Sequence, residues 1–183
     1  LRPALWALSV FAVGSAVFYV APPIRYGHRA LGEVFVCLNM GFIMVSASAT
    51  LLLGHFEPCS LALALPVGLM VAGVLYYQSL PEIETDLAAG KHTLANTLGK
   101  AGAFLLFRLW WPLIWLLLCN LWAAGLAGWP VVLCLTGLPF YLVACRRIRL
   151  AGDGDWLPLD AHGHLVRKCY LISGAALILG VLL

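Results

Sequence analysis

The chain alternates between long stretches without charged residues and short charged segments. No Asp, Glu, Lys or Arg occurs in residues 3–24, 34–56 or 58–81. A helix of about 20 apolar residues crosses the ~30 Å hydrocarbon core of a bilayer. Backbone at membrane depth is helical unless it lines a cavity. The pattern therefore predicts an all-α, polytopic membrane bundle, formed as one domain over residues 1–183, with about six spans at residues 5–20, 31–53, 61–79, 101–124, 129–145 and 164–183.

Composition supports the membrane class. Hydrophobic residues make up 63% of the chain and charged residues only 10%, whereas soluble domains carry about 25% charge. The formal net charge of +3 is spread over short loops and forms no single basic face, so a nucleic-acid partner is not expected. The six cysteines lack the paired spacing of a zinc site or a disulfide framework.

The positive charges orient the predicted spans. Apart from Arg2 and Arg108, all Lys and Arg residues fall in alternate loops, at residues 25–29, 91–100 and 146–168. Loops rich in Lys and Arg lie on the cytoplasmic side of a membrane. We therefore expect a multi-pass protein of the cell (inner) membrane, with these loops in the cytoplasm and both chain ends outside.

The acidic stretch at residues 77–99 is the best candidate for chemistry. Glu82 and Asp86 are four residues apart, which places them on one face of a continuing helix, with Glu84 on the opposite side. Mg²⁺ is usually held by one or two carboxylates together with substrate phosphates, and Lys91 is suited to phosphate oxygens. The alternative is a solvated acidic loop between two spans.

Other charged residues have two interpretations each. Pro22 and Pro23 end the first span, and Arg25 and Arg29 after them can clamp an anion or simply anchor the loop at the membrane surface. Arg108, inside the fourth span, is either a functional charge or a side chain that reaches back to the interface.

Three motifs resemble a known family. The pattern Leu-Pro-Glu-Ile-Glu-Thr-Asp-x-x-Ala-Gly-Lys-x-Thr-Leu-Ala-x-x-Leu-Gly at residues 80–99 resembles the second aspartate-rich motif of the UbiA superfamily of intramembrane prenyltransferases. The runs Tyr-x-x-x-Pro-x-Arg at 19–25 and Arg-Ala-Leu-Gly-Glu at 29–33 support the resemblance, in the right order. The branch that transfers polyprenyl groups to 1,4-dihydroxy-2-naphthoate is the most similar.

The resemblance implies a function and a site. Such enzymes use Mg²⁺ to transfer a polyprenyl group from polyprenyl diphosphate to an aromatic acceptor, here in menaquinone-type quinone biosynthesis. By position, the metal-binding and catalytic acids would be Glu82 and Asp86. The residues that bind the diphosphate would be Lys91, Arg25, Arg29 and Tyr19. His92 stands where an arginine is frequent.

One departure from the family pattern concerns its first aspartate-rich motif, Asn-x-x-x-Asp-x-x-x-Asp, since no Asp precedes Asp86. The six spans would match the last six of the family's nine helices. This leads to the hypothesis that the chain is a C-terminal part of a prenyltransferase. The alternatives are a non-catalytic membrane protein that binds an isoprenoid diphosphate or a quinone, and a half-enzyme whose partner chain supplies the missing N-terminal helices.

Overall fold

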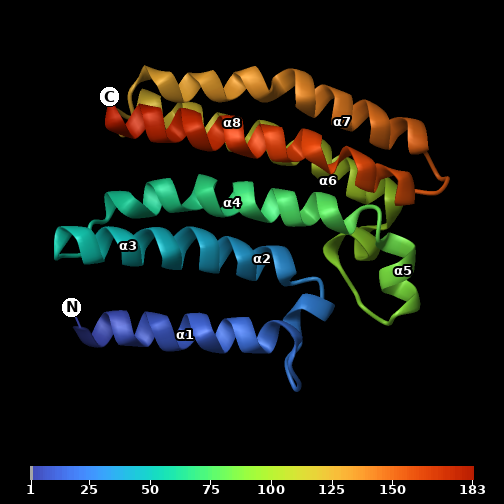
Figure 1. The fold of residues 1–183 in the computed structure, drawn as a ribbon, viewed down its shortest axis with the longest axis horizontal. Coiled ribbons are helices and arrows are strands. Elements are labelled where there is room, and N and C mark those ends of the chain that lie inside the picture. Colours follow the sequence, from blue (N-terminus) through green and yellow to red (C-terminus); the bar gives the residue numbers. More distant parts are fainter. Residues whose placement is uncertain (1) are drawn as a thin grey trace.

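The computed structural model describes the backbone of residues 2–183, and the elements found there are helices that run side by side (Figure 1). The helices are α1 (Arg2–Val20), α2 (Gly32–Val36), α3 (Met44–Leu53), α4 (Cys59–Ser79), α5 (Ile83–Ala88), α6 (Leu94–Ala123), α7 (Leu138–Ala151) and α8 (Gly163–Leu182). A π-helical segment, Cys37–Ile43, joins α2 and α3 into one rod. Short 3-10 segments cover Tyr26–His28, Trp129–Gly137 and Leu157–His162.

The membrane bundle expected from the sequence is confirmed. Among the described residues, five helical segments are long and apolar enough to cross a bilayer: Gly32–Leu53, Cys59–Ser79, Leu94–Ala123, Trp129–Ala151 and Leu157–Leu182. The first expected span corresponds to a shorter apolar helix, Leu5–Val20. The chain is therefore an all-α protein of the multi-pass membrane class.

Three helix boundaries differ from the sequence expectation. The fourth segment begins at Leu94 rather than at residue 101, with a break in the helical backbone at Gly99, whose φ is +67°. The fifth segment continues past residue 145 to Ala151, although this adds Arg146, Arg147 and Arg149. Cations are favoured in the last turn of a helix, where they face the negative end of its dipole, so these arginines do not end it. The last segment begins at Leu157 rather than at residue 164, because a 3-10 turn leads directly into α8.

The buried core lies among α4, α6 and α8, and aromatic residues fill much of it. Tyr76, Phe107 and Trp111 are almost fully buried. The Tyr76 hydroxyl donates to the Ala103 carbonyl at 2.9 Å, and the Trp115 indole donates to the Ser173 hydroxyl at 3.1 Å, whereas the buried Trp111 indole has no hydrogen-bond partner among the described residues. Leucines and other apolar side chains cover the outward faces, as expected for helices in lipid.

The rod of α2 and α3 crosses α4 at two glycines. A Cβ added at Gly41 would lie 2.5 Å from the Ala64 carbonyl oxygen and 2.7 Å from the Gly68 Cα. At Gly68 an added Cβ would lie 2.5 Å from the Cys37 carbonyl oxygen. Membrane helices approach this closely only where small residues meet. The pair therefore fixes the distance between the two rods.

Gly41→Ala is expected to lower the stability of the bundle. The added methyl group meets backbone rather than a flexible side chain, and overpacking of this kind costs about 1–3 kcal/mol. Thermal unfolding of the purified chain in detergent measures the loss. Gly174→Ala is the matched control, because an added Cβ there has nothing within 4 Å. Equal melting temperatures for the two variants would mean that the crossing is not tightly packed.

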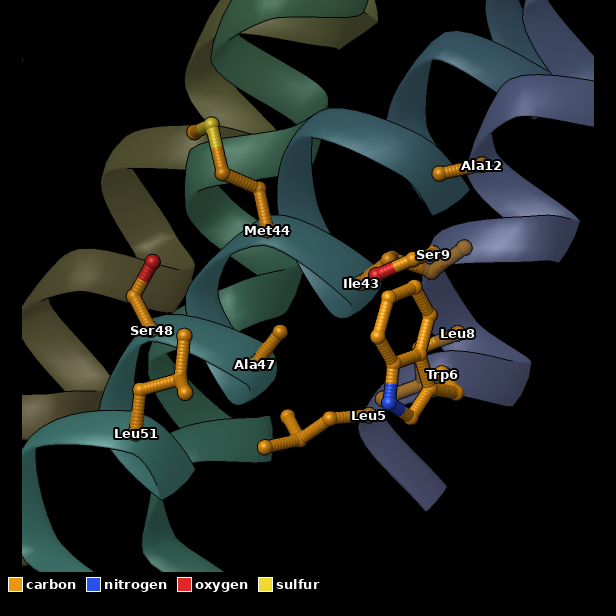
Figure 2. A pocket seen from close by; sticks show the side chains of 10 residues that line it. All are labelled: Leu5, Trp6, Leu8, Ser9, Ala12, Ile43, Met44, Ala47, Ser48 and Leu51. Atoms are coloured by element: carbon orange, nitrogen blue, oxygen red, sulfur yellow. The ribbon is translucent and has the colours of Figure 1, made fainter. Parts of the chain in front are cut away.

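An apolar groove of about 420 Å³ separates α1 from α3 at the end of the bundle away from α5 (Figures 1 and 2). Its lining is mostly apolar, with Trp6, Ile43 and Leu51 among the larger side chains and Ser9 and Ser48 as small polar ones. No charged side chain belongs to this lining, so the groove is not a candidate for diphosphate chemistry.

Candidate functional site

The candidate site is built on the turn between α4 and α6, which contains the short helix α5. The chain reverses after α5 at Gly90, whose φ of +70° favours glycine. Helix α6 then begins with a capping box: the Thr93 hydroxyl accepts from the Asn96 amide, and the Asn96 side chain accepts from the Thr93 amide. The side-chain amide of Asn96 also donates to the Lys91 carbonyl at 2.9 Å. These contacts fix the backbone of Lys91.

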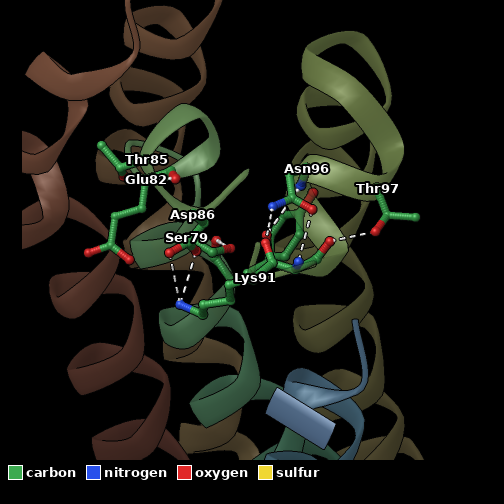
Figure 3. A network of polar contacts seen from close by, with 9 residues as sticks. Ser79, Glu82, Thr85, Asp86, Lys91, Asn96 and Thr97 are labelled. Atoms are coloured by element: carbon green, nitrogen blue, oxygen red, sulfur yellow. Dashed lines mark hydrogen bonds and ion pairs between the residues drawn. The ribbon is translucent and has the colours of Figure 1, made fainter. Parts of the chain in front are cut away.

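Asp86 and Lys91, both predicted as site residues, are in direct contact (Figure 3). The Lys91 ammonium lies 2.9 Å from Oδ2 and 3.1 Å from Oδ1 of Asp86. The Asp86 side chain is only 12% exposed and that of Lys91 30%. The Lys91 amide also donates to the Asp86 carbonyl at 2.8 Å. The structure thus holds a nearly buried carboxylate with a cation on both of its oxygens.

Glu82 lies at the edge of this pair. Helix α5 begins one residue later, and Glu82 precedes it with φ −92° and ψ 4°. Its side chain is exposed and, in Figure 3, its carboxylate lies to one side of the Asp86–Lys91 contact. Within residues 2–183, no group of three or more His, Cys, Asp or Glu side chains is placed to hold a metal ion. Any cation here would need ligands beyond these two acids.

Glu84 faces the other way, as its spacing predicts. The Lys100 ammonium lies 2.8 Å from Glu84 Oε1 and donates to the carbonyls of Asp153 and Gly154 at 3.2 and 2.7 Å. This contact connects α5 to the loop after α7. Glu84 and Lys100 therefore form a structural link that is separate from Asp86 and Lys91.

The first basic loop packs against the Lys91 segment. The Ala30 amide donates to the His92 carbonyl at 2.8 Å, and the His92 amide donates to the His28 carbonyl at 3.2 Å. Arg29 and His92 accordingly form an isolated parallel β-bridge. Two motifs that are about sixty residues apart in the sequence thus meet at one end of the bundle.

Tyr19 lies beneath that loop and completes the cluster. A Cβ added at Gly27 would lie 2.9 Å from the Tyr19 ring, so only glycine lets the loop approach this closely. The Tyr19 ring also packs edge-on against Tyr26, with centroids 5.4 Å apart. Tyr19 is near enough to Lys91 and Asp86 to interact with their charges.

The two loop arginines point outward. Arg25 and Arg29 are exposed, and Arg29 Nη2 donates to the Pro23 carbonyl at 3.1 Å. Neither guanidinium forms an ion pair with a carboxylate of the described chain. The structure therefore places both arginines at the same end as Lys91, with their charges available to an anion.

Two charged residues of this region were not singled out as site residues from the sequence. Glu33, the last residue of the Arg-Ala-Leu-Gly-Glu run, is buried and close enough to Lys91 and Tyr19 for electrostatic interaction. Arg167, counted only as a loop charge, lines a cavity of about 490 Å³ together with Tyr19. Glu33 ends the Arg-Ala-Leu-Gly-Glu run, which could have pointed to it, whereas Arg167 belongs to no motif and reaches the cavity only through the packing of α8.

That cavity lies between four elements: α1, the rod of α2 and α3, α4 and α8. Its walls are apolar, with Val36, Met40, Val71, Val74, Leu75 and Leu171 among the lining residues, and Tyr19, Gln78, Arg167 and Tyr170 also line it. A ligand pocket of this volume is within the usual range. The arrangement suits a molecule with a long apolar part and an anionic end near Arg167.

Asn96→Ala is expected to loosen the Lys91 loop without unfolding the bundle. The variant loses the contact to the Lys91 carbonyl and one half of the capping box, and changes of this type cost about 0.5–2 kcal/mol. Hydrogen exchange should accelerate at the amides of residues 90–93. The control is Asn120→Ala, because Asn120 only donates to a carbonyl of its own helix. Unchanged exchange at 90–93 would contradict the role of Asn96.

Comparisons with known proteins show the family of the chain. The model of the UbiA prenyltransferase family matches residues 1–158. The 1,4-dihydroxy-2-naphthoate octaprenyltransferase of Escherichia coli is 29% identical over 98% of this chain and 56% of its own length. The protein of the same name from Haemophilus influenzae is 32% identical over 50% of this chain and 30% of its own.

A vertebrate relative is also similar: UbiA prenyltransferase domain-containing protein 1 of Gallus gallus is 28% identical over 63% of this chain and 34% of its own length. The chain thus spans between about a third and just over half of these relatives. No solved structure matches the chain.

Proposed function

Since this chain belongs to the UbiA prenyltransferase family, we propose that it transfers a polyprenyl group from polyprenyl diphosphate to an aromatic quinone precursor of the dihydroxynaphthoate type, in menaquinone-type biosynthesis. The observation that carries the proposal is the Asp86–Lys91 pair. Its charges are close enough to act on Tyr19, and Tyr19 also lines an apolar cavity. The site thereby combines groups for a diphosphate with a space for an isoprenoid chain.

Asp86 and Glu82 are the proposed ligands of Mg²⁺. The donor chemistry fits, because Mg²⁺ takes carboxylate oxygens and completes its shell with water and substrate phosphates. The nearly buried Asp86 carboxylate already holds a cation, the Lys91 ammonium, on both oxygens. When bound, Mg²⁺ neutralises the charge that develops on a departing diphosphate. Glu82, exposed next to Asp86, must turn toward it to contribute a ligand.

Lys91 changes its partner in this scheme. With the Asp86 carboxylate holding a metal ion, the flexible side chain of Lys91 would be free to place its ammonium on a phosphate oxygen. Arg25 and Arg29 add positive charge from the adjoining loop, and the Tyr19 hydroxyl can donate to the same anion. Positive groups that are already in place stabilise the leaving diphosphate without reorganisation.

The apolar cavity protects the reacting group. Loss of diphosphate leaves an allylic cation, which water would quench. Walls of Val, Leu and Met side chains exclude water and accept the polyprenyl chain. We place this site on the cytoplasmic side of the cell (inner) membrane, because the loops that form it carry most of the Lys and Arg residues.

In the direct test, labelled polyprenyl diphosphate and an aromatic acceptor are added to membranes that contain the chain. The expected result is Mg²⁺-dependent prenylation of 1,4-dihydroxy-2-naphthoate, stopped by a chelator, with a single-ring hydroxybenzoate used far less. Mg²⁺-dependent retention of the diphosphate without any prenylated acceptor would instead support a non-catalytic isoprenoid-binding protein. Absence of both would contradict the site assignment.

A further inference from the structure

A second cationic site lies on the other side of the bundle from Tyr19, in a groove between α6 and α7. The groove has a volume of about 560 Å³ and is lined by Phe104, Arg108, Leu142, Cys145, Arg146 and Arg149. Half of this lining is arginine, and none of it is acidic. The groove shares no lining residue with the cavity at Tyr19.

Helical spacing gathers the arginines on facing stripes. On α7, Leu142, Arg146 and Arg149 are spaced four and three residues apart, so they lie on one face. On α6, Arg108 lies one turn beyond Phe104. The intervening Arg147 does not line the groove. The Tyr141 hydroxyl donates to the Arg108 carbonyl at 2.7 Å and holds the two helices together beside the groove.

The three charges have no carboxylate partner. No ion pair of the described chain includes Arg108, Arg146 or Arg149. The Arg108 guanidinium instead lies over the Phe104 ring, 5.8 Å from its centroid. Because Phe104 precedes Arg108 by one turn, the guanidinium is directed toward the N-terminal end of α6. A neighbouring hollow is lined by Arg149, Lys100 and one acid, Asp153, which does not line the groove itself.

The surroundings indicate lipid rather than water. Leu105, Leu109 and Val143 are exposed on the same two helices, which are long and apolar enough to span a membrane. Charge inside a span is costly unless it is paired or reaches the interface. Three like charges that meet in a lipid-facing groove therefore favour an anion that arrives from the membrane.

We propose that this groove binds the phosphate headgroup of an anionic membrane phospholipid. A guanidinium matches a phosphate with two parallel hydrogen bonds, and basic pockets between membrane helices on the cytoplasmic side are suited to such headgroups. The acyl chains would lie along Leu142 and its exposed apolar neighbours. This site is independent of the proposed prenyl transfer, since it contains none of its residues.

The test is lipid binding by the purified 183-residue chain, measured by native mass spectrometry in detergent with equal amounts of phosphatidylglycerol and phosphatidylcholine of the same chain length. The wild type should retain one phosphatidylglycerol in clear preference. Each of Arg108→Gln, Arg146→Gln and Arg149→Gln should weaken its binding by about tenfold. Arg147→Gln is the matched control and should retain it, because Arg147 lies outside the groove.

A soluble phosphate compound is the competing ligand. Inorganic diphosphate, added at the same concentration, should not displace phosphatidylglycerol, since it lacks acyl chains. Displacement at equal concentration would overturn the lipid assignment in favour of a soluble anion. Equal retention of the two lipids, or equal loss in Arg147→Gln and Arg149→Gln, would overturn the site itself. Arg149 lies at the exposed end of α7, so its variant tests the proposal even if Arg108→Gln does not fold.

Discussion

Asp86→Asn is expected to reduce Mg²⁺-dependent prenyl transfer by about 10²- to 10³-fold. The substitution keeps the shape of the side chain but removes the only nearly buried carboxylate that contacts Lys91. Loss of one preorganised electrostatic group in an active site has an effect of this size. Initial rates at saturating polyprenyl diphosphate, across a range of Mg²⁺ concentrations, measure it.

Glu84→Gln is the matched control for Asp86→Asn. Glu84 belongs to the same short helix, but its partner is Lys100 on the far side. An exposed ion pair of this kind contributes about 0–1 kcal/mol to stability, so the rate should stay near that of the wild type. If the two variants lost activity equally, the whole turn rather than Asp86 would be responsible.

Lys91→Gln is expected to have two opposite effects. The KM for polyprenyl diphosphate should rise about 10- to 100-fold, because a hydrogen bond to a charged group contributes about 1.5–3 kcal/mol. Without diphosphate, the affinity of the chain for Mg²⁺ should increase, since the ammonium no longer competes for Asp86. Steady-state kinetics measure the first effect, and a metal titration of the purified chain measures the second.

The control for Lys91→Gln is Lys100→Gln, which removes the same charge from the same region. Lys100 contacts Glu84 and two carbonyls of the loop after α7 and not Asp86. Neither the KM nor the Mg²⁺ affinity should change in that variant by more than a small factor. A fall in Mg²⁺ affinity on Lys91→Gln would contradict the exchange of partners at Asp86.

The membrane fold could be predicted because it depends on local composition. Long uncharged runs specify spans, and each expected span corresponds to an apolar helix. The predicted helix ends were less accurate where charged residues lie inside a helix rather than after it. Arginines at the end of α7 are compatible with the helix dipole, so the charge at residue 146 did not mark the end of the helix.

The contact between Asp86 and Lys91 was not visible in the spacing of their motif. It depends on the left-handed Gly90 and on the capping of α6 by Thr93 and Asn96, which turn Lys91 back over α5. Glu82, although four residues from Asp86, is the N-cap residue of α5 and lies to one side of the pair.

Contacts between residues far apart in the sequence could not be predicted from any motif. The bridge between Arg29 and His92 joins two loops through backbone hydrogen bonds, which any residue type could make. Arg167 reaches the cavity at Tyr19 only because α8 packs against α4. Such contacts arise from the packing of helices and leave no trace in the local sequence.

The measurement that tests the central claim most directly is the binding of inorganic diphosphate to the purified chain, with and without Mg²⁺, by calorimetry. The claim is that Asp86 and Lys91 form one site for a metal ion and a diphosphate. It predicts binding that requires Mg²⁺, is lost in Asp86→Asn and persists in Glu84→Gln. Binding of equal strength without a divalent ion, or in Asp86→Asn, would contradict it.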